Sequence, residues 1–154
     1  MPPSLVIFDM DDVLCSYDLA RRLRALSRVS GKTPRDIRSA IWDSGFESDS
    51  DSGGYPESSG YLAEFGRRLG YPLSREEWIA ARRESMTPTP EVLDLAKQMA
   101  SRARLVIFSN NGPLMKEHLG EIFPEAAQIF RECYCSCEPA CKKPDPNSYL
   151  RLLG

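Results

Sequence analysis

Two short runs of consecutive apolar residues are conspicuous because both end abruptly in polar side chains. The first is residues 5–8 (LVIF), followed by acidic residues, and the second is residues 105–108 (LVIF), followed by residues 109–112 (SNNG). Unbroken apolar runs of this length are typical of parallel strands that are buried on both faces. Ligands bind at the carboxyl ends of strands in open α/β sheets, so the two polar clusters predict a site.

Most of the chain between the two runs has the apolar spacing of helices. Leu19, Leu23 and Leu26 form one stripe of a helix predicted over residues 17–29. Thr33-Pro34 is typical of a helix start, and Ser74 with Glu77 forms a capping box. Residues 43–60 are rich in Ser, Gly and acidic side chains, so they predict a loop. Further helices are predicted over residues 61–69 (ending at Gly70), 89–101, 112–118 and 147–152, and a third strand over 133–137.

Strands that alternate with helices predict an α/β fold with a parallel sheet and right-handed crossovers. The roughly 70 residues after the first strand are too many for one crossover connection. We therefore expect a core formed by residues 1–15 and 87–154, with residues 16–86 inserted as a helical cap over the carboxyl edge of the sheet.

Composition narrows the class of protein. The 154 residues suffice for one domain, and a formal charge of -2 argues against a protein that coats nucleic acid. No apolar run approaches the roughly 18 residues that a bilayer crossing needs. The first residues lack the basic and apolar regions of a secretory signal, and the five cysteines suit a reducing compartment. These features predict a cytoplasmic protein with neither a membrane nor a nucleic-acid partner.

The strongest chemical signal is the segment FDMDDVL at residues 8–14. Asp9 and Asp11 are two residues apart just after the first strand, so their carboxylates repel each other unless a cation lies between them. Mg²⁺ prefers such oxygen ligands. A carboxylate beside a metal and an anionic substrate can also act as a nucleophile and form an aspartyl phosphate. The alternative is that these acids only cap a turn.

Two later segments offer groups that bind phosphate. Ser109 and Asn110 supply a hydroxyl and backbone N–H groups at the end of the second strand. Lys143 lies in the segment KKPDP at residues 142–146, where two prolines stiffen the loop. A nucleophile, a hydroxyl and a lysine in this order favour phosphoryl transfer.

With these motifs, the sequence resembles the haloacid dehalogenase-like (HAD) hydrolases over nearly its whole length, and most closely the branch with a small helical cap. The resemblance implies a Rossmann-like core, Asp9 as nucleophile and Asp11 as acid and base. It also implies that Asp9 and Asp11 hold Mg²⁺, and that Ser109 and Lys143 bind the phosphoryl group. The expected substrate is a small phosphorylated metabolite.

The second carboxylate separates the reactions of this family. Dehalogenases lack it because a halide leaving group needs no proton, whereas an alkoxide does. Asp11 therefore favours a Mg²⁺-dependent phosphatase over a 2-haloacid dehalogenase. A sugar phosphomutase-type reaction and a non-catalytic, metal-deficient module are further alternatives. Asp12 replaces the glycine that is common at its position.

The most serious departure from the family pattern concerns the fourth motif. The fourth motif, an acidic pair after a further strand, has no counterpart before Gly154, so we expect the final core strand or strands to be missing. A fragment of a longer product, a natural short form, and a partner chain that completes the sheet are three explanations, of which a fragment is favoured. The first strand would then be an apolar edge that invites a homodimer.

Three weaker signals have plain structural interpretations. Cys133, Cys135, Cys137 and Cys141 could hold zinc, but their spacing is unusual and small core residues are the simpler explanation. The basic residues of the cap predict a solvated helical face, or one or two arginines that bind an anionic substrate: Arg21, Arg22, Arg24, Arg28, Lys32, Arg35 and Arg38. Trp42 and Phe46 are expected to face either the substrate or the core of the cap.

Overall fold

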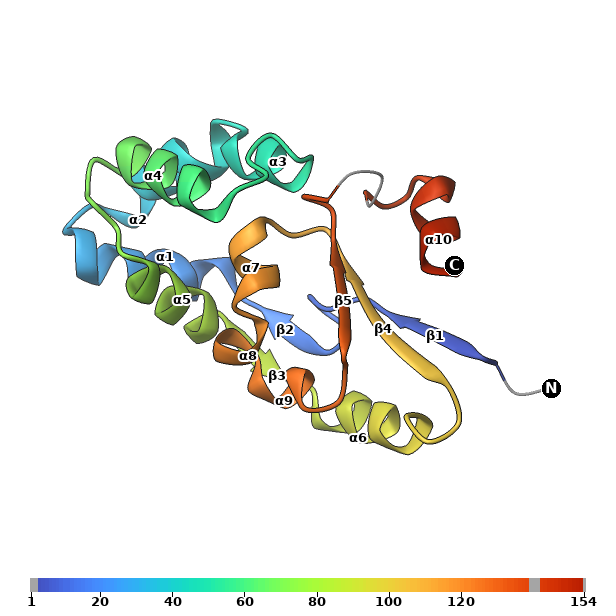
Figure 1. Ribbon diagram of the computed structural model, residues 1–154. Helices are drawn as coiled ribbons and strands as arrows, with labels where there is room; N and C mark the ends of the chain where they lie inside the picture. Colours follow the sequence, from blue (N-terminus) through green and yellow to red (C-terminus); the bar gives the residue numbers. More distant parts are fainter. Residues whose placement is uncertain (1–2, 139–141, 154) are drawn as a thin grey trace.

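The centre of the molecule is a parallel sheet of three strands. The computed structural model describes residues 3–138 and 142–153. Within them the strands lie in the order β1 (Leu5–Phe8), β4 (Arg104–Ser109) and β5 (Glu132–Cys135) (Figure 1). Because all three strands are parallel, their carboxyl ends meet at one edge. The predicted α/β fold with a parallel sheet is therefore confirmed.

Strand β4 is buried at every position after its first residue, as the unbroken apolar run predicts. Its side chains alternate between two apolar clusters. Leu105 and Ile107 belong to the main core, whereas Val106 and Phe108 pack with Leu152 on the opposite face. Strand β1 lies at the edge of the described sheet and is only partly buried before Phe8.

The two faces of the sheet are covered by different helices. The main core includes side chains from α6 (Pro90–Met99), α7 (Pro113–Glu117), α8 (Leu119–Ile122) and α9 (Pro124–Ala127). The other face carries α10 (Pro146–Leu153), close to the carboxyl end of the chain (Figure 1). None of the described helices has the length and apolar character that a membrane crossing requires.

An inserted helical unit separates β1 from β4. It begins and ends in an antiparallel ribbon formed by β2 (Cys15–Tyr17) and β3 (Met86–Pro88). We call residues 18–85 the cap. Its elements are α1 (Leu19–Ser30), α2 (Pro34–Arg38), a π-helical turn (Ser39–Asp43), α3 (Phe46–Asp51), α4 (Ser58–Leu69) and α5 (Arg75–Glu84).

Local sequence signals set most helix boundaries in the cap. Thr33 caps α2 by accepting a hydrogen bond from the Asp36 N–H, and Ser74 and Glu77 form the predicted capping box of α5. Helix α4 ends at Gly70, whose φ of 66° lies in the left-handed region that glycine adopts without strain. These predicted starts and ends are confirmed.

The predicted loop over residues 43–60 is wrong. This segment contains α3 and the start of α4. Phe46 is fully buried and stacks on Tyr61, with ring centroids 5.3 Å apart, and it also contacts Phe65 edge-on at 6.0 Å. The packing of one aromatic side chain therefore outweighs a polar composition that favours a loop.

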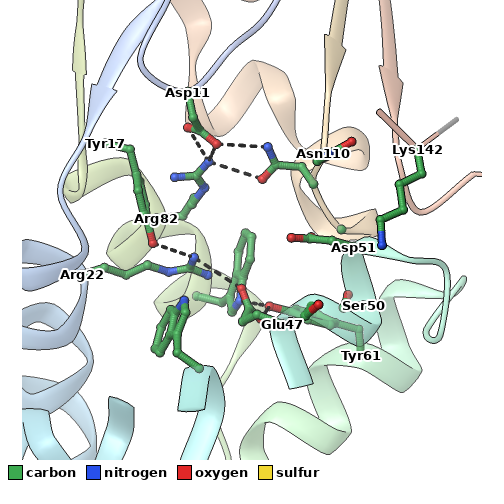
Figure 2. Close-up of a pocket in the computed structure, with 15 residues that line it drawn as sticks. Asp11, Tyr17, Arg22, Glu47, Ser50, Asp51, Tyr61, Arg82, Asn110 and Lys142 are labelled. Atoms are coloured by element: carbon green, nitrogen blue, oxygen red, sulfur yellow. Dashed lines mark hydrogen bonds and ion pairs between the residues drawn. The ribbon is translucent and has the colours of Figure 1, made fainter. Parts of the chain in front are cut away.

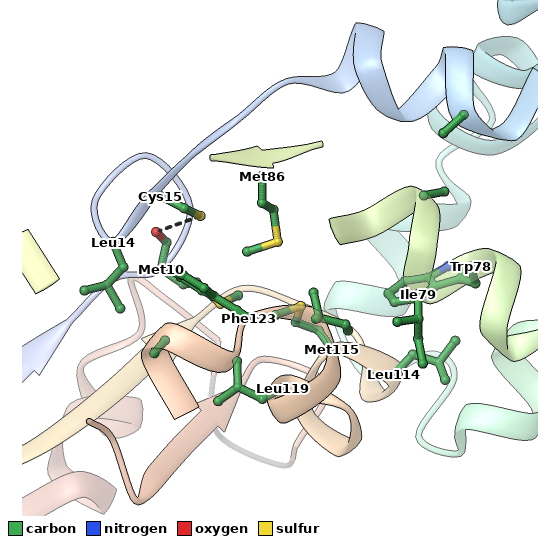
Figure 3. Close-up of a cluster of buried hydrophobic side chains, with 14 of the residues drawn as sticks. Met10, Leu14, Cys15, Trp78, Ile79, Met86, Leu114, Met115, Leu119 and Phe123 are labelled. Atoms are coloured by element: carbon green, nitrogen blue, oxygen red, sulfur yellow. Dashed lines mark hydrogen bonds between the residues drawn. The ribbon is translucent and has the colours of Figure 1, made fainter. Parts of the chain in front are cut away.

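One continuous apolar cluster joins the cap to the core. Figure 3 shows Ile79 and Trp78 of α5 close to Leu114 of α7, with Met115 and Phe123 beyond them. The interior packing of proteins is dense, so this cluster fixes the position of the cap over the sheet.

Candidate active site

Asp9 follows β1 directly, at the carboxyl edge of the sheet. Its side chain is 46% exposed, and Lys143 Nζ lies 2.6 Å from its Oδ2 atom. The backbone N–H of Met10 donates a hydrogen bond to Oδ1 at 2.8 Å. Both contacts hold the carboxylate in one orientation. The structure therefore presents Asp9 as an accessible, oriented anion beside a cation.

Lys143 reaches Asp9 because its loop is tied to the end of β4. The Asn110 side chain donates to the carbonyl of Lys143 at 3.2 Å and accepts from its N–H at 3.0 Å. The ammonium group also lies 5.5 Å from the centre of the Phe108 ring. Asn110, which we expected to contact phosphate, is thus engaged in positioning Lys143.

Asp11 has different partners from Asp9, although only one residue separates them. Both of its carboxylate oxygens accept hydrogen bonds from Arg82 Nη2 at 2.8 Å, and Oδ2 also accepts one from Asn111 at 3.1 Å. Asp12 follows with a φ of 61°, a left-handed turn in which its side chain accepts from the Tyr17 N–H. Asp11 is therefore held between the core and the cap.

Ser109 lies at the carboxyl end of β4 and is 2% exposed. Its hydroxyl oxygen accepts a hydrogen bond from the Asn111 side chain at 2.7 Å. Asn111 thus connects Ser109 to Asp11. The structure brings Asp9 together with Lys143, and Asp11 together with Ser109 through Asn111.

Sequence reasoning missed Arg82 and Asn111. Arg82 lies on the apolar stripe of α5 that contains Trp78 and Ile79, at the spacing of one helix face. An arginine on an apolar stripe is the signal that could have identified it. Asn111 adjoins the polar cluster that we noted, but no spacing rule distinguished it from Asn110.

A cavity of about 420 Å³ lies between the cap and the carboxyl edge of the sheet. Asp11, Asn110 and Asn111 line it from the core, while Asp9, Ser109 and Lys143 do not (Figure 2). The cap contributes charged, aromatic and hydroxyl side chains: Tyr17 at its junction, Arg22, Trp42, Glu47, Ser48, Ser50, Asp51, Tyr61, Trp78 and Arg82. The cavity extends from Asp11, which is predicted to act as both acid and base, into the cap.

Two acidic side chains of α3, Glu47 and Asp51, line this cavity and have different surroundings. Burial raises the pKa of Asp51 to about 7, and the nearby charge of Glu47 adds to this, while Arg22 and Arg82 act in the opposite direction. Asp51 is therefore only partly ionised near neutral pH. Glu47 accepts a hydrogen bond from the Tyr61 hydroxyl at 2.6 Å.

Within the described ranges, no group of three or more His, Cys, Asp or Glu side chains is arranged around a metal position. Mg²⁺ keeps several waters and is commonly bound by one or two carboxylates together with substrate phosphates. The exposed carboxylate of Asp9 fits that kind of site, whereas the carboxylate of Asp11 is engaged by Arg82.

The cysteines near β5 are mainly buried. The Sγ atoms of Cys133 and Cys135 are 3.9 Å apart, and burial raises the pKa of Cys137 to about 11, so that its thiol stays protonated. Cys141, the fourth member of the hypothetical zinc set, lies outside the described residues.

These features define a Rossmann-like α/β core with a helical cap over its carboxyl edge. No protein-family model matches the sequence, and no curated protein sequence is significantly similar to it. Solved structures do match its shape.

A predicted HAD-like family hydrolase from Porphyromonas gingivalis has a TM-score of 0.74 at 20% identity, covering 97% of this chain and 74% of its own. A HAD family enzyme from Bacteroides thetaiotaomicron, in complex with magnesium and inorganic phosphate, has a TM-score of 0.73 at 17% identity. The match covers 98% of this chain and 77% of that enzyme. L-2-haloacid dehalogenase from Xanthobacter autotrophicus, with chloropropionic acid covalently bound, has a TM-score of 0.57 at 18% identity. The match covers 97% of this chain and 63% of the dehalogenase. This chain therefore has the fold of the HAD-like hydrolases.

Proposed function

We propose that this protein hydrolyses small phosphomonoesters through an aspartyl phosphate formed on Asp9. The observation that carries the proposal is the exposed Asp9 carboxylate, held by Lys143 at the sheet edge next to a second, separately held carboxylate, Asp11. The magnesium and inorganic phosphate in the similar Bacteroides thetaiotaomicron enzyme support it. The proposal includes a cytoplasmic site of action, where free thiols such as Cys15 persist.

In the first step, a carboxylate oxygen of Asp9 attacks the phosphorus atom. An O–P bond to Asp9 forms while the P–O bond to the leaving group breaks, and the leaving oxygen takes a proton from the protonated carboxyl of Asp11. Lys143 stabilises the negative charge on the transferred group, and Ser109 supplies a hydroxyl.

In the second step, the Asp11 carboxylate takes a proton from a water molecule as the water oxygen attacks phosphorus. The O–P bond to Asp9 breaks, inorganic phosphate leaves, and both aspartates return to their initial states. Arg82 and Asn111 orient Asp11 through hydrogen bonds to its carboxylate in both steps.

Mg²⁺ is part of the proposal. Asp9 would hold the ion together with the backbone carbonyl of Asp11 and phosphate oxygens, and its charge would neutralise the phosphoryl group. The other ligands would be waters.

The test is phosphate release from a panel of small phosphomonoesters, with Mg²⁺ and with a chelator. Asp9→Asn removes the nucleophile with little change of shape, so we expect turnover to fall by about a thousandfold or more. Asp94→Asn is the matched control, because Asp94 is an exposed residue of α6 paired only with Lys97 among the described contacts.

Release that requires Mg²⁺, is lost in Asp9→Asn and survives in Asp94→Asn would support the mechanism. Unchanged turnover in a folded Asp9→Asn variant would show that Asp9 is not the nucleophile. No release from any compound would favour the non-catalytic alternative.

Dehalogenation is the second candidate, favoured by the match to L-2-haloacid dehalogenase. Chloride release from 2-chloropropionate without phosphatase activity would establish it. The presence of Asp11 favours the phosphatase, because a halide leaving group needs no proton.

A further inference from the structure

Two buried arginines of the cap line the cavity beside Asp11. Arg22 lies on α1 and is 4% exposed, and Arg82 lies on α5 and is 2% exposed. Figure 2 shows both guanidinium groups on the cap side of the cavity, with Tyr17 between them. Arginine is seldom buried to this extent without full pairing, so their partners need to be accounted for.

Neither guanidinium group is fully paired. Arg82 uses Nη2 for Asp11 and Asn111, while its Nη1 has no hydrogen-bond partner in the described parts of the chain. Arg22 donates from Nη1 to the Tyr17 hydroxyl at 3.3 Å, while its Nε and Nη2 have no partner there either. Buried donors without acceptors are rare and unfavourable, so a group with acceptor oxygens is expected to complete them.

Aromatic rings hold these donors in place. The Arg22 guanidinium lies 5.3 Å from the ring centre of Trp42 and 4.9 Å from that of Trp78. Arg82 lies 4.6 Å from the ring centre of Tyr17. Such stacking leaves the edges of a guanidinium group open for planar recognition of a carboxylate or phosphate. The two arginines are therefore arranged before any ligand arrives.

The acidic side chains of the cavity only partly balance the positive charge of Arg22 and Arg82. Arg22 is 3.7 Å from Glu47, longer than a hydrogen bond, and Glu47 is bonded instead to the Tyr61 hydroxyl. Asp51 is partly protonated near neutral pH because burial raises its pKa to about 7. Lys142 lines the cavity from the core side. Three basic side chains, Arg22, Arg82 and Lys142, thus line the cavity with Asp11, Glu47 and a partly protonated Asp51.

We propose that Arg22 and Arg82 bind a second anionic group, a carboxylate or a phosphate, on the leaving-group part of the substrate. The proposal rests on the phosphatase function and narrows its substrate class to small phosphomonoesters that carry two anionic groups. Arg82 contacts Asp11, so the second group binds on the side of Asp11 that opens into the cap. A volume of about 420 Å³ suits a small metabolite.

The test compares three compounds of similar size. Glycerol 3-phosphate has one anionic group, 3-phosphoglycerate adds a carboxylate, and glycerol 1,3-bisphosphate adds a phosphate. We expect kcat/KM for at least one of the doubly anionic compounds to exceed that for glycerol 3-phosphate by about tenfold or more. Whichever compound is preferred identifies the second group.

Variants of Arg22 test whether the preference for doubly anionic compounds arises in the cavity. Arg22→Gln should remove most of it, and Arg22→Lys should retain part of it, because lysine keeps the charge but lacks the planar fork. Arg24→Gln is the matched control, since Arg24 is exposed on the same helix and its loss should leave the preference intact. The comparison of compounds on the wild-type protein needs no variant, so misfolding of Arg22→Gln would not prevent a decision.

Hydrolysis of all three compounds at similar kcat/KM would overturn the second-anion proposal and leave the phosphatase function intact. A preference that survives in folded Arg22→Gln would overturn it as well. If no compound is hydrolysed, the phosphatase function fails, and calorimetric titration of the same compounds still tests the cavity. Tighter binding of a doubly anionic compound that is lost in Arg22→Gln would then retain the anion site, and equal or absent binding would reject it.

Discussion

Asp51 is the acidic residue whose surroundings change its chemistry most clearly. Burial and the charge of Glu47 raise its pKa to about 7, against roughly 4 in an unfolded chain. Between these values the folded protein binds a proton that the unfolded chain lacks. The free energy of unfolding therefore contains a contribution that is complete at low pH and is lost as pH rises through about 7.

We predict that replacing Asp51 by Asn removes this contribution. The difference in unfolding free energy between wild type and Asp51→Asn should change by up to about 4 kcal/mol between pH 4 and pH 8, with wild type losing stability relative to the variant as pH rises. Urea unfolding at several pH values measures it. Asp49→Asn, at an exposed position of the same helix, should follow wild type, and parallel profiles for Asp51→Asn and wild type would refute the prediction.

At the residue scale, sequence patterns located both acids and Lys143, the partner of Asp9, but not Arg82 and Asn111, the partners of Asp11. Asp9, Asp11, Ser109 and Lys143 were recognisable because each follows a strand or lies in a proline-stiffened loop. Arg82 was not, because its role depends on Asp11, which lies 71 residues away along the chain. A helix pattern records which face is apolar, but it does not reveal an acid from another segment that stabilises a buried charge.

At the scale of elements, the end of α4 depends on close backbone packing. A Cβ atom on Gly66 would lie 2.9 Å from the carbonyl oxygen of Tyr71 and 3.4 Å from the N atom of Leu73. The Tyr71 N–H donates to the carbonyl of Gly66 at 3.1 Å, so these backbones cannot separate freely. Gly60, on the same helix, has open space around its Cβ position.

We predict opposite effects of alanine at these two glycines. Gly66→Ala should destabilise the protein by about 1–3 kcal/mol because backbone atoms must move. Gly60→Ala should be neutral or stabilise it by up to about 1 kcal/mol, because alanine favours helices. Thermal and urea unfolding of both variants measure this, and equal stability of the two would count against the described packing.

The elements themselves were predictable where local signals were strong. The capping box at Ser74 and the glycine end of α4 are local features, and both are confirmed. Helix α3 was missed because the buried side chain that stabilises it, Phe46, packs against a helix further along the chain. The ribbon of β2 and β3 was missed because strands of three residues are too short for a period to be detected.

At the scale of the whole molecule, β1 forms an apolar edge of the described sheet. Leu5, Val6 and Ile7 are each only partly buried. An edge strand offers unpaired backbone groups to another chain, and charged side chains on such edges oppose pairing. The homodimer proposed from the sequence would use this edge.

We predict that the protein self-associates through β1 and that Leu5→Lys shifts it towards the monomer. Sedimentation over a range of concentrations measures the change in mass. Leu95→Lys is the control, since Leu95 is 51% exposed on α6 and its replacement should leave association unchanged. A wild-type protein that remains monomeric at every concentration would rule out this dimer.

The hydrogen bonds between Arg82 and Asp11 join the cap to the core at the point where the proposed chemistry needs a proton. Arg82 can orient Asp11 only while the cap is seated on the sheet. The same contact therefore links the cap to the core and orients the proposed acid. A change in the cap that removed this contact would alter the proposed acid as well as the cavity, so substrate selection and proton transfer would be impaired together.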